Sequence, residues 1–333
     1  MTATAEMAAA LGTGDRRTLA RAITLIESTR NSDRAAADAL LDAVLPTTGG
    51  ALRLGITGTP GVGKSTFIDA FGMMLANLGR RVAVLAVDPT SSRNGGSILG
   101  DKTRMATLSR EPTAFIRPSP SGGLTGGVAR RTHETLLACE AAGFDVVIVE
   151  TMGVGQAETA VADITDVFLL LVAPGGGDDL QGIKRGIMEL ADVVAVNKAD
   201  GELASAARHT AADYRSALHL VRPKWSGSPT PVVPCSALTR DGLDAVWATI
   251  DEFHGALAGD GRLAALRADQ AEVHLRQQLD GLLADQLRSV PAFAARWPEL
   301  EAAVRANERT PGSAARALMA EALPHLLDPP ARS

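Results

Sequence analysis

The 333-residue chain is expected to adopt an α/β fold, with a doubly wound, mostly parallel sheet in a central domain and a helical extension at each end. Two observations predict the sheet. Short apolar segments rich in Val, Leu and Ile suit strands that are buried on both faces. Amphipathic stretches separate these segments, which indicates crossover helices between consecutive strands. The predicted strands are residues 52–57, 81–87, 113–117, 144–149, 166–173, 192–197 and 230–235.

Both ends of the chain instead repeat apolar residues at helical spacing. The N-terminal pattern, which includes Leu19 and Ile23, ends at Pro46. The C-terminal pattern is a Leu-rich stripe, and three prolines after it are expected to divide the chain into short helices. The stripe runs from Leu263 to Leu287, and the prolines are Pro291, Pro298 and Pro311. The predicted domains are an N-terminal helical extension (1–48), a central domain (49–258) and a C-terminal helical arm (259–333).

The Leu-rich stripe has no evident partner within its own sequence. We therefore expect the C-terminal arm to form a homodimer. The alternative is that the stripe packs against the central domain of its own chain.

Composition and charge exclude several classes of protein. The net charge is −5, and the only aromatic residues are 7 Phe, 3 Trp and 1 Tyr, which is unlike a nucleic-acid-binding surface. The longest apolar run, Val167–Ala173, is far shorter than the ~20 residues that span a bilayer. The N-terminus lacks the pattern of a secretory signal. Cys139 and Cys235 lie far apart and form no CxxC motif. We expect a cytoplasmic protein with no nucleic-acid or membrane partner.

The strongest motif is Gly58-Thr59-Pro60-Gly61-Val62-Gly63-Lys64-Ser65, a complete GxxxxGKS between a predicted strand and a predicted helix. Its glycines allow backbone N–H groups to surround a phosphate, and the following helix N-terminus adds a partial positive charge. Lys64 is expected to reach the β- and γ-phosphates, and the Ser65 hydroxyl to bind Mg²⁺. The predicted phosphate contacts are Gly58, Gly61, Val62, Gly63, Lys64, Ser65 and Thr66.

A second motif, Asn197-Lys198-Ala199-Asp200, follows the strand 192–197 at the edge where doubly wound sheets bind ligands. A carboxylate in this position accepts hydrogen bonds from the ring N–H and the exocyclic amine of guanine. Adenine lacks the ring N–H. Ser236-Ala237-Leu238, after the last predicted strand, is typical of the loop that contacts the guanine carbonyl. The two motifs together favour GTP or GDP over ATP.

Three acidic residues are candidates for the Mg²⁺ site and for hydrolysis. Glu150 ends the strand 144–149 within Glu150-Thr151-Met152-Gly153, where other GTPases carry DxxG. Asp88 ends the strand 81–87, and Asp101 follows a glycine-rich loop. The alternative is that these residues are helix caps or surface acids. The predicted catalytic residues are Lys64, Asp88, Asp101 and Glu150, and the predicted metal ligands are Ser65, Asp88, Asp101 and Glu150.

The loop 173–184 leaves the strand 166–173 and contains three consecutive glycines. It ends at Lys184, one of only five lysines in the chain. We interpret the loop as a nucleotide-responsive switch with Lys184 as its charged residue. The alternative is an ordinary flexible connection.

These motifs together resemble the MeaB/ArgK-like G-protein chaperones of methylmalonyl-CoA mutase, within the SIMIBI class of P-loop proteins. The resemblance is densest in the P-loop, residues 88–105, residues 144–158 and the NKAD motif. It implies a GTP-binding domain over 49–258, and it places Asp88, Asp101 and Glu150 at Mg²⁺ and hydrolysis positions. It also implies slow GTP hydrolysis, a homodimer through the C-terminal arm, and association with an adenosylcobalamin-dependent mutase. In that association the protein gates cofactor loading and protects the mutase from inactivation.

Two other functions fit the sequence less well. A nickel metallochaperone of the same class would need a cluster of Cys and His ligands, and residues 1–50 contain neither. A small-molecule kinase would need an acceptor site, which the sequence does not reveal.

Overall fold

The computed structural model describes residues 3–28, 30–88, 105–120, 125–151, 157–175, 185–220, 224–225 and 229–327. The chain divides into two compact units, Met1–Gln270 and Ala271–Ser333. None of the described helices is both long enough and apolar enough to cross a membrane.

The first unit is built on one seven-stranded sheet, whose strand order is β3-β2-β4-β1-β5-β6-β7. Every paired strand runs parallel to its neighbours, which confirms the predicted α/β fold. All seven predicted strands are present. They are β1 (Leu52–Gly58), β2 (Val82–Asp88), β3 (Ala114–Pro120), β4 (Val146–Thr151), β5 (Val167–Val172), β6 (Val193–Val196) and β7 (Val232–Pro234).

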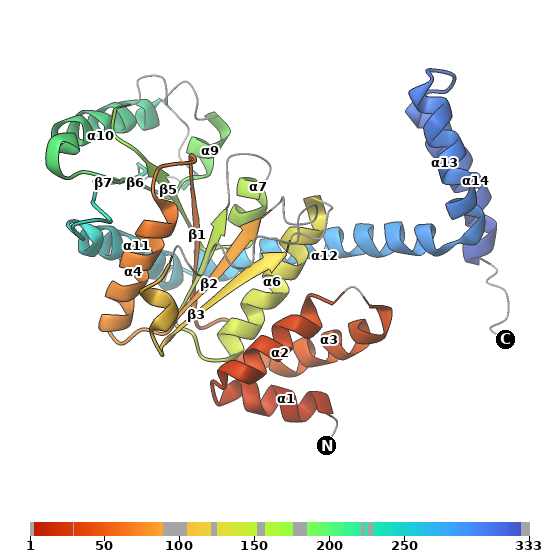
Figure 1. Ribbon diagram of the computed structural model, residues 1–333, viewed down its shortest axis with the longest axis horizontal. Coiled ribbons are helices and arrows are strands. Elements are labelled where there is room, and N and C mark those ends of the chain that lie inside the picture. The colour runs from red at the N-terminus through yellow and green to blue at the C-terminus, as the bar shows by residue number, and fades with distance from the viewer. Residues whose placement is uncertain are drawn as a thin grey trace. The chain divides into compact units, whose positions relative to one another are not determined.

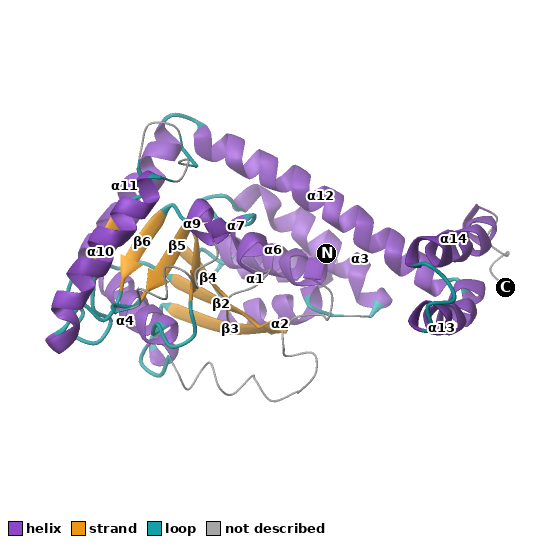
Figure 2. Cartoon of the chain, turned by 90° about the horizontal axis from the view of Figure 1, so that it is seen from above, coloured by secondary structure: helices purple, strands orange, loops and turns teal. Residues whose placement is uncertain are grey.

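Helices cover both faces of this sheet (Figures 1 and 2). On one face α4 (Lys64–Asn77) and α11 (Leu243–Gly259) pack Phe67, Phe71 and Val246 against Leu54 and Ile56 of β1. The other face is covered by α6 (Thr125–Ala141), α7 (Ala157–Ala162), α9 (Arg185–Leu190) and α10 (Ala204–His219). Three short 3₁₀ helices, η1 (Leu45–Thr47), η2 (Leu108–Arg110) and η3 (Gly201–Leu203), lie in connections.

The N-terminal helices are packed into the first unit. They are α1 (Ala3–Gly12), α2 (Arg16–Ile26) and α3 (Asn31–Val44). The apolar residues that predicted them, including Leu19, Ile23 and Leu40, are buried in the same cluster as Phe144 and Val147. Two ion pairs also connect these N-terminal helices to the rest of the unit. Glu27 pairs with Arg117 of β3, and Arg34 lies 2.9 Å from Glu134 of α6.

An Asp directly precedes the first residue, a Val, of β4, β5 and β6. Each Asp makes the same kind of hydrogen bond at the amino edge of the sheet. Its carboxylate accepts a backbone N–H that would otherwise end the ladder without a partner. Asp145 accepts from Arg81 at 2.7 Å, Asp166 from Arg53 at 2.9 Å, and Asp192 from Phe168 at 2.8 Å. These bonds join β4 to β2, β5 to β1, and β6 to β5.

The C-terminal region is helical. It contains α12 (Arg262–Ser289), α13 (Pro291–Arg305) and α14 (Pro311–Leu327). Pro291 and Pro311 each occupy the first helical position, where a missing N–H costs nothing. Pro298 was expected to end a helix, and that prediction was wrong because Pro298 lies inside α13. The helix continues through it because Phe293 and Leu300, on either side, are buried against Leu318 of α14.

Candidate functional site

The P-loop connects the carboxyl end of β1 to the first residue of α4. Gly58 passes so close to β5 that a Cβ there would lie 2.5 Å from the carbonyl oxygen of Leu171. Gly63 precedes α4 with a φ of +95°, which a side chain would strain. The Lys64 ammonium folds back over the loop, 2.6 Å from the Gly58 carbonyl and 3.4 Å from that of Thr59. The P-loop motif therefore forms a tight turn, and the Lys64 ammonium is hydrogen-bonded to backbone carbonyls of that turn.

Asn197, at the end of β6, ties the phosphate loop to the proposed base-binding loops. Its Nδ2 donates to the Val62 carbonyl at 2.9 Å, and its Oδ1 accepts from the Ala237 N–H at 3.0 Å. Asn197 is buried, and the next residue, Lys198, has a φ of +59°. Lys198 Nζ donates to the Gly61 carbonyl at 2.7 Å. Three motifs that are distant in the sequence thus meet at one edge of the sheet.

Asp200 is held by Ser236. The Ser236 hydroxyl donates to Asp200 Oδ1 at 2.5 Å and accepts the backbone N–H groups of Leu238 and Thr239 at 3.2 and 3.1 Å. Ser236 is fully buried, whereas the Leu238 side chain is 78% exposed. The carboxylate that is predicted to recognise guanine is therefore fixed in direction, with an exposed apolar side chain beside it.

Of the predicted metal and hydrolysis residues, the structure brings Ser65 and Glu150 together. Glu150 ends β4 with only 1% of its surface exposed, and its Oε1 accepts from the Ser65 hydroxyl at 3.4 Å. A hydroxyl and a carboxylate oxygen are the hard ligands that Mg²⁺ prefers, so this pair fits the ion. Asp88 ends β2, which pairs with β4, but its side chain lies outside the described residues. Asp101 and Lys184 also lie outside them.

Two carboxylates act on Lys64. Burial lowers the pKa of its ammonium, and the negative charges of Glu150 and Glu158 raise it in opposition. Sequence reasoning did not select Glu158, which lies in the first turn of α7 and is 1% exposed. The available signal was its place as the last residue of the 144–158 motif.

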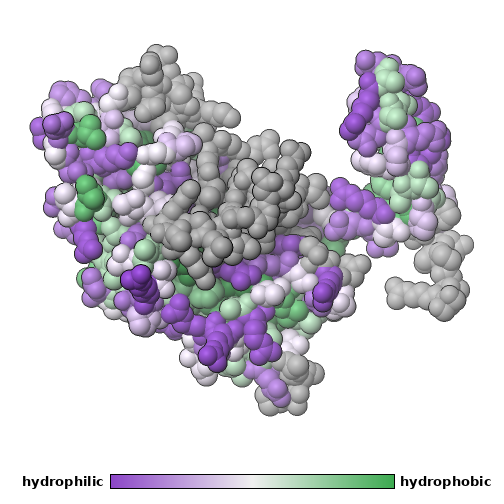
Figure 3. All heavy atoms as spheres, viewed as in Figure 1, coloured by the Kyte–Doolittle hydropathy of each residue, from purple (hydrophilic) through white to green (hydrophobic). Residues whose placement is uncertain are grey.

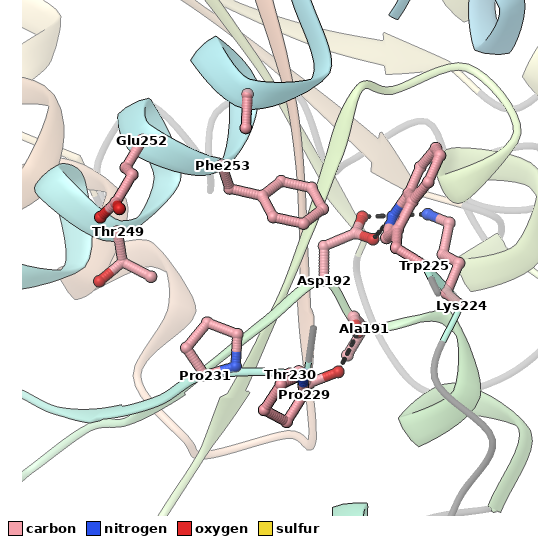
Figure 4. Close-up of a pocket in the computed structure, with 11 residues that line it drawn as sticks. Ala191, Asp192, Lys224, Trp225, Pro229, Thr230, Pro231, Thr249, Glu252 and Phe253 are labelled. Carbon is pink, nitrogen blue, oxygen red and sulfur yellow. Dashed lines mark hydrogen bonds and ion pairs between the residues drawn. The ribbon is translucent and has the colours of Figure 1, made fainter. Parts of the chain in front are cut away.

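A small cavity lies at the opposite edge of the sheet, at the amino ends of β6 and β7 (Figure 4). Its volume is about 230 Å³, and Asp192, Trp225, Pro231 and Phe253 help to line it. Asp192 accepts from Trp225 Nε1 at 2.8 Å and Lys224 Nζ at 3.0 Å, but burial outweighs these bonds and raises the pKa of its carboxyl. Ligands of parallel sheets bind at the carboxyl ends of the strands, so this cavity is separate from the nucleotide site.

In the part of the chain that the structure describes, no three or more His, Cys, Asp or Glu side chains gather into a group suited to a metal ion. Both cysteines are buried, and burial raises the pKa of the Cys235 thiol to about 12. Neither thiol is poised for nucleophilic chemistry.

Comparisons with known proteins agree with this geometry. The family model for the methylmalonyl-CoA mutase-associated GTPase MeaB matches residues 19–292. A putative GTPase of Caulobacter vibrioides is 55% identical over 307 residues, which cover 92% of this chain and 94% of the relative. GTPase ArgK of Escherichia coli is 49% identical over 317 residues, which cover 94% of this chain and 95% of the relative.

Solved structures include a similar chain. A crystal structure titled LAO/AO transport system kinase matches with a TM-score of 0.73 and 42% sequence identity. The match covers 95% of this chain and 96% of that one. On its sequence and its fold, the chain belongs to the family of methylmalonyl-CoA mutase-associated GTPases described by the MeaB model.

Proposed function

We propose that the chain is a regulatory GTPase that binds GTP with Mg²⁺ and associates with an adenosylcobalamin-dependent methylmalonyl-CoA mutase. In this function it gates cofactor loading and protects the mutase from inactivation. One observation carries the nucleotide part. Asn197 bonds to both the P-loop and the Ser236-Ala237-Leu238 loop, so the phosphate and base motifs form one site. The mutase part is supported by the family to which the chain belongs.

Binding of GTP would replace hydrogen bonds that Lys64 makes within the P-loop. The Lys64 ammonium would leave the Gly58 carbonyl for the β- and γ-phosphates, where the hydrogen bonds are charge-assisted and stronger. Asp200, oriented by Ser236, would accept the two N–H groups of guanine. Ser65, Asp88, Asp101 and Glu150 would hold Mg²⁺. The ion would neutralise charge that develops on the phosphates.

The nucleotide part is tested by substituting its charged residues. We expect Lys64→Ala to remove most of the hydrolysis, because losing a hydrogen bond to a charged group, roughly 1.5–3 kcal/mol, slows the reaction about 10- to 150-fold. Glu150→Ala and Asp101→Ala should lower GTP turnover more than they weaken GDP binding, since these residues serve the γ-phosphate end. Equal losses of GDP and GTP binding with normal turnover would assign both acids a structural role instead.

The mutase part is tested by affinity capture from the native cytoplasm, with and without a non-hydrolysable GTP analogue. We expect a cobalamin-dependent mutase to be recovered, in amounts that depend on the analogue. The matched control is Asp200→Asn, which should lose the dependence on the guanine nucleotide. Recovery of a nickel enzyme in place of the mutase would overturn the assignment.

A further inference from the structure

Glu158 is a buried carboxylate for which the proposed function has no role. It lies in the first turn of α7, and only 1% of its surface is exposed. Its negative charge raises the pKa of the Lys64 ammonium, the cation of the P-loop, against the effect of burial.

The path of α7 places Glu158 over the carboxyl end of β1. Val161, one turn later on the same helix face, packs so tightly on β1 that a Cβ on Gly55 would lie 3.0 Å from Val161 Cγ1. α7 connects β4 to β5, and both run parallel to β1, so α7 runs in the opposite direction (Figure 1). One turn back from Val161 therefore leads from Gly55 toward Gly58, where the P-loop begins.

Two carboxylates consequently approach the P-loop from opposite faces of the sheet. Side chains alternate along a strand, so Thr57 shares the α7 face with Gly55. Its hydroxyl accepts a hydrogen bond at 2.8 Å from Thr151 of β4, and both side chains are fully buried. Glu150, the neighbour of Thr151, faces the other way and contacts Ser65 of α4.

Lys64 Nζ lies at the carboxyl end of β1, 2.6 Å from the Gly58 carbonyl. We propose that Glu158 is a positioning residue for GTP hydrolysis, which holds the Lys64 ammonium from the α7 side of the sheet, opposite Glu150. In this role it acts through Lys64 and keeps the ammonium aligned with the γ-phosphoryl group as that group is transferred. The inference rests on the proposed nucleotide site and adds a residue to it.

The test separates alignment from binding. Glu158→Gln keeps the size of the side chain and removes its charge, so the ammonium still binds phosphate but is no longer held in place. We expect kcat for GTP to fall about tenfold, while KM for GTP and Kd for GDP change by less than about twofold. Glu158→Asp keeps the charge with a shorter reach, and should lower kcat only about two- to threefold. Glu252→Gln, an exposed acid on α11, is the matched control and should behave as wild type.

A kcat of Glu158→Gln equal to wild type would overturn the proposal. So would a parallel loss of kcat, GDP binding and melting temperature, with Asp no better than Gln, because that pattern is structural. Should Glu158→Gln fail to fold, Glu158→Asp decides. A lowered kcat at unchanged GDP affinity supports the proposal, and a wild-type kcat overturns it. If Lys64→Ala hydrolyses GTP as fast as wild type, the nucleotide site itself is wrong. If the Glu158 variants turn over GTP normally while Lys64→Ala does not, the role of Glu158 is wrong and the nucleotide site stands.

Discussion

At the residue scale, the candidate site depends on side chains that hold other side chains. Asn197 bonds to two loops and Ser236 fixes Asp200, so the residues predicted to recognise the base are positioned by side chains that are themselves buried. A buried hydrogen-bonded group is held in place because leaving its partner unsatisfied costs about 1–3 kcal/mol. The arrangement of the predicted base-binding loops is therefore held by the protein's own hydrogen bonds.

Asp200→Asn is expected to exchange guanine for xanthine specificity. The new amide can donate to the xanthine ring carbonyl but cannot accept both guanine N–H groups, so GTP affinity should fall about 100-fold while xanthosine triphosphate gains affinity. Nucleotide affinities measured by fluorescence titration check this, with Asp213→Asn on the exposed side of α10 as control. Unchanged GTP affinity in Asp200→Asn would show that the base is read elsewhere.

At the element scale, the amino edge of the sheet is fastened by acidic residues at strand starts. Asp166 connects this edge to α12, because Arg267 of α12 donates to its two oxygens at 2.8 and 2.6 Å. Burial alone would raise the pKa of Asp166, but the hydrogen bonds and charge of Arg267, with His254 3.6 Å away, outweigh burial and lower it. For Asp192 the balance is reversed and its pKa is raised. Two equivalent positions thus respond to pH in opposite directions.

Asp166→Asn and Asp192→Asn should therefore change stability with opposite pH dependence. The lowered pKa of Asp166 means that its ionised form stabilises the fold above its unfolded value of 3.8, and that this contribution is lost in acid. The raised pKa of Asp192 gives a contribution that is complete below 3.8 and lost as the pH rises. At neutral pH Asp166→Asn should cost about 3–5 kcal/mol, since Arg267 loses a buried partner.

Urea unfolding from pH 3.5 to 8 provides the measurement. The free-energy deficit of Asp166→Asn relative to wild type should shrink as the pH falls below about 4, whereas that of Asp192→Asn should grow as the solution becomes more acidic. Deficits that move in the same direction for both variants would contradict the assignment of opposite shifts.

At the scale of the whole molecule, α12 belongs to both compact units. Its first turns are fastened to the first unit. Arg267 donates to the carbonyls of Gly49 and Ala51, and Gln270 donates to that of Thr165 at 2.8 Å. The rest of α12 bears exposed leucines, and apolar side chains also reach the surface of the α13–α14 pair (Figure 3). An arm with this much exposed apolar surface favours association with another chain.

We predict that the exposed leucines of α12 form a homodimer. Leu275, Leu279, Leu282 and Leu283 share one helix face and are each 52–68% exposed. Glutamate at both Leu279 and Leu283 should convert the dimer to a monomer in sedimentation analysis, because charge is costly to bury. Asp280→Lys, off this face, is the control. A persisting dimer would place the interface elsewhere. A truncated chain that lacks the arm should end after Gln270, so that the contacts of Arg267 with the first unit are kept.

The proposed switch loop is tested in the complex with the mutase. Slow intrinsic hydrolysis is expected because the sequence contains no evident water-positioning Gln or arginine finger, and supplying such groups typically accelerates turnover by ~10³–10⁵. We predict that Lys184→Ala keeps GTP affinity and basal hydrolysis nearly intact but loses the acceleration by methylmalonyl-CoA mutase. GTP turnover with and without the mutase measures this. A variant that the mutase stimulates as fully as wild type would reduce 173–184 to an ordinary connection.

The sequence by itself determined the sheet, the P-loop and the base-recognition motifs. Continuous Val, Leu and Ile runs can only be buried between helices, and the chemistry of glycine, lysine and asparagine at strand ends is local to each motif. Tertiary structure alone decided which side chains meet. Arg267 and Asp166 are 101 residues apart, the charge of Glu158 acts on Lys64 across the fold, and Pro298 remains in a helix because α14 packs against it. Hydrophobic periodicity and sequence motifs each describe one segment of the chain, whereas these contacts depend on how distant segments pack together.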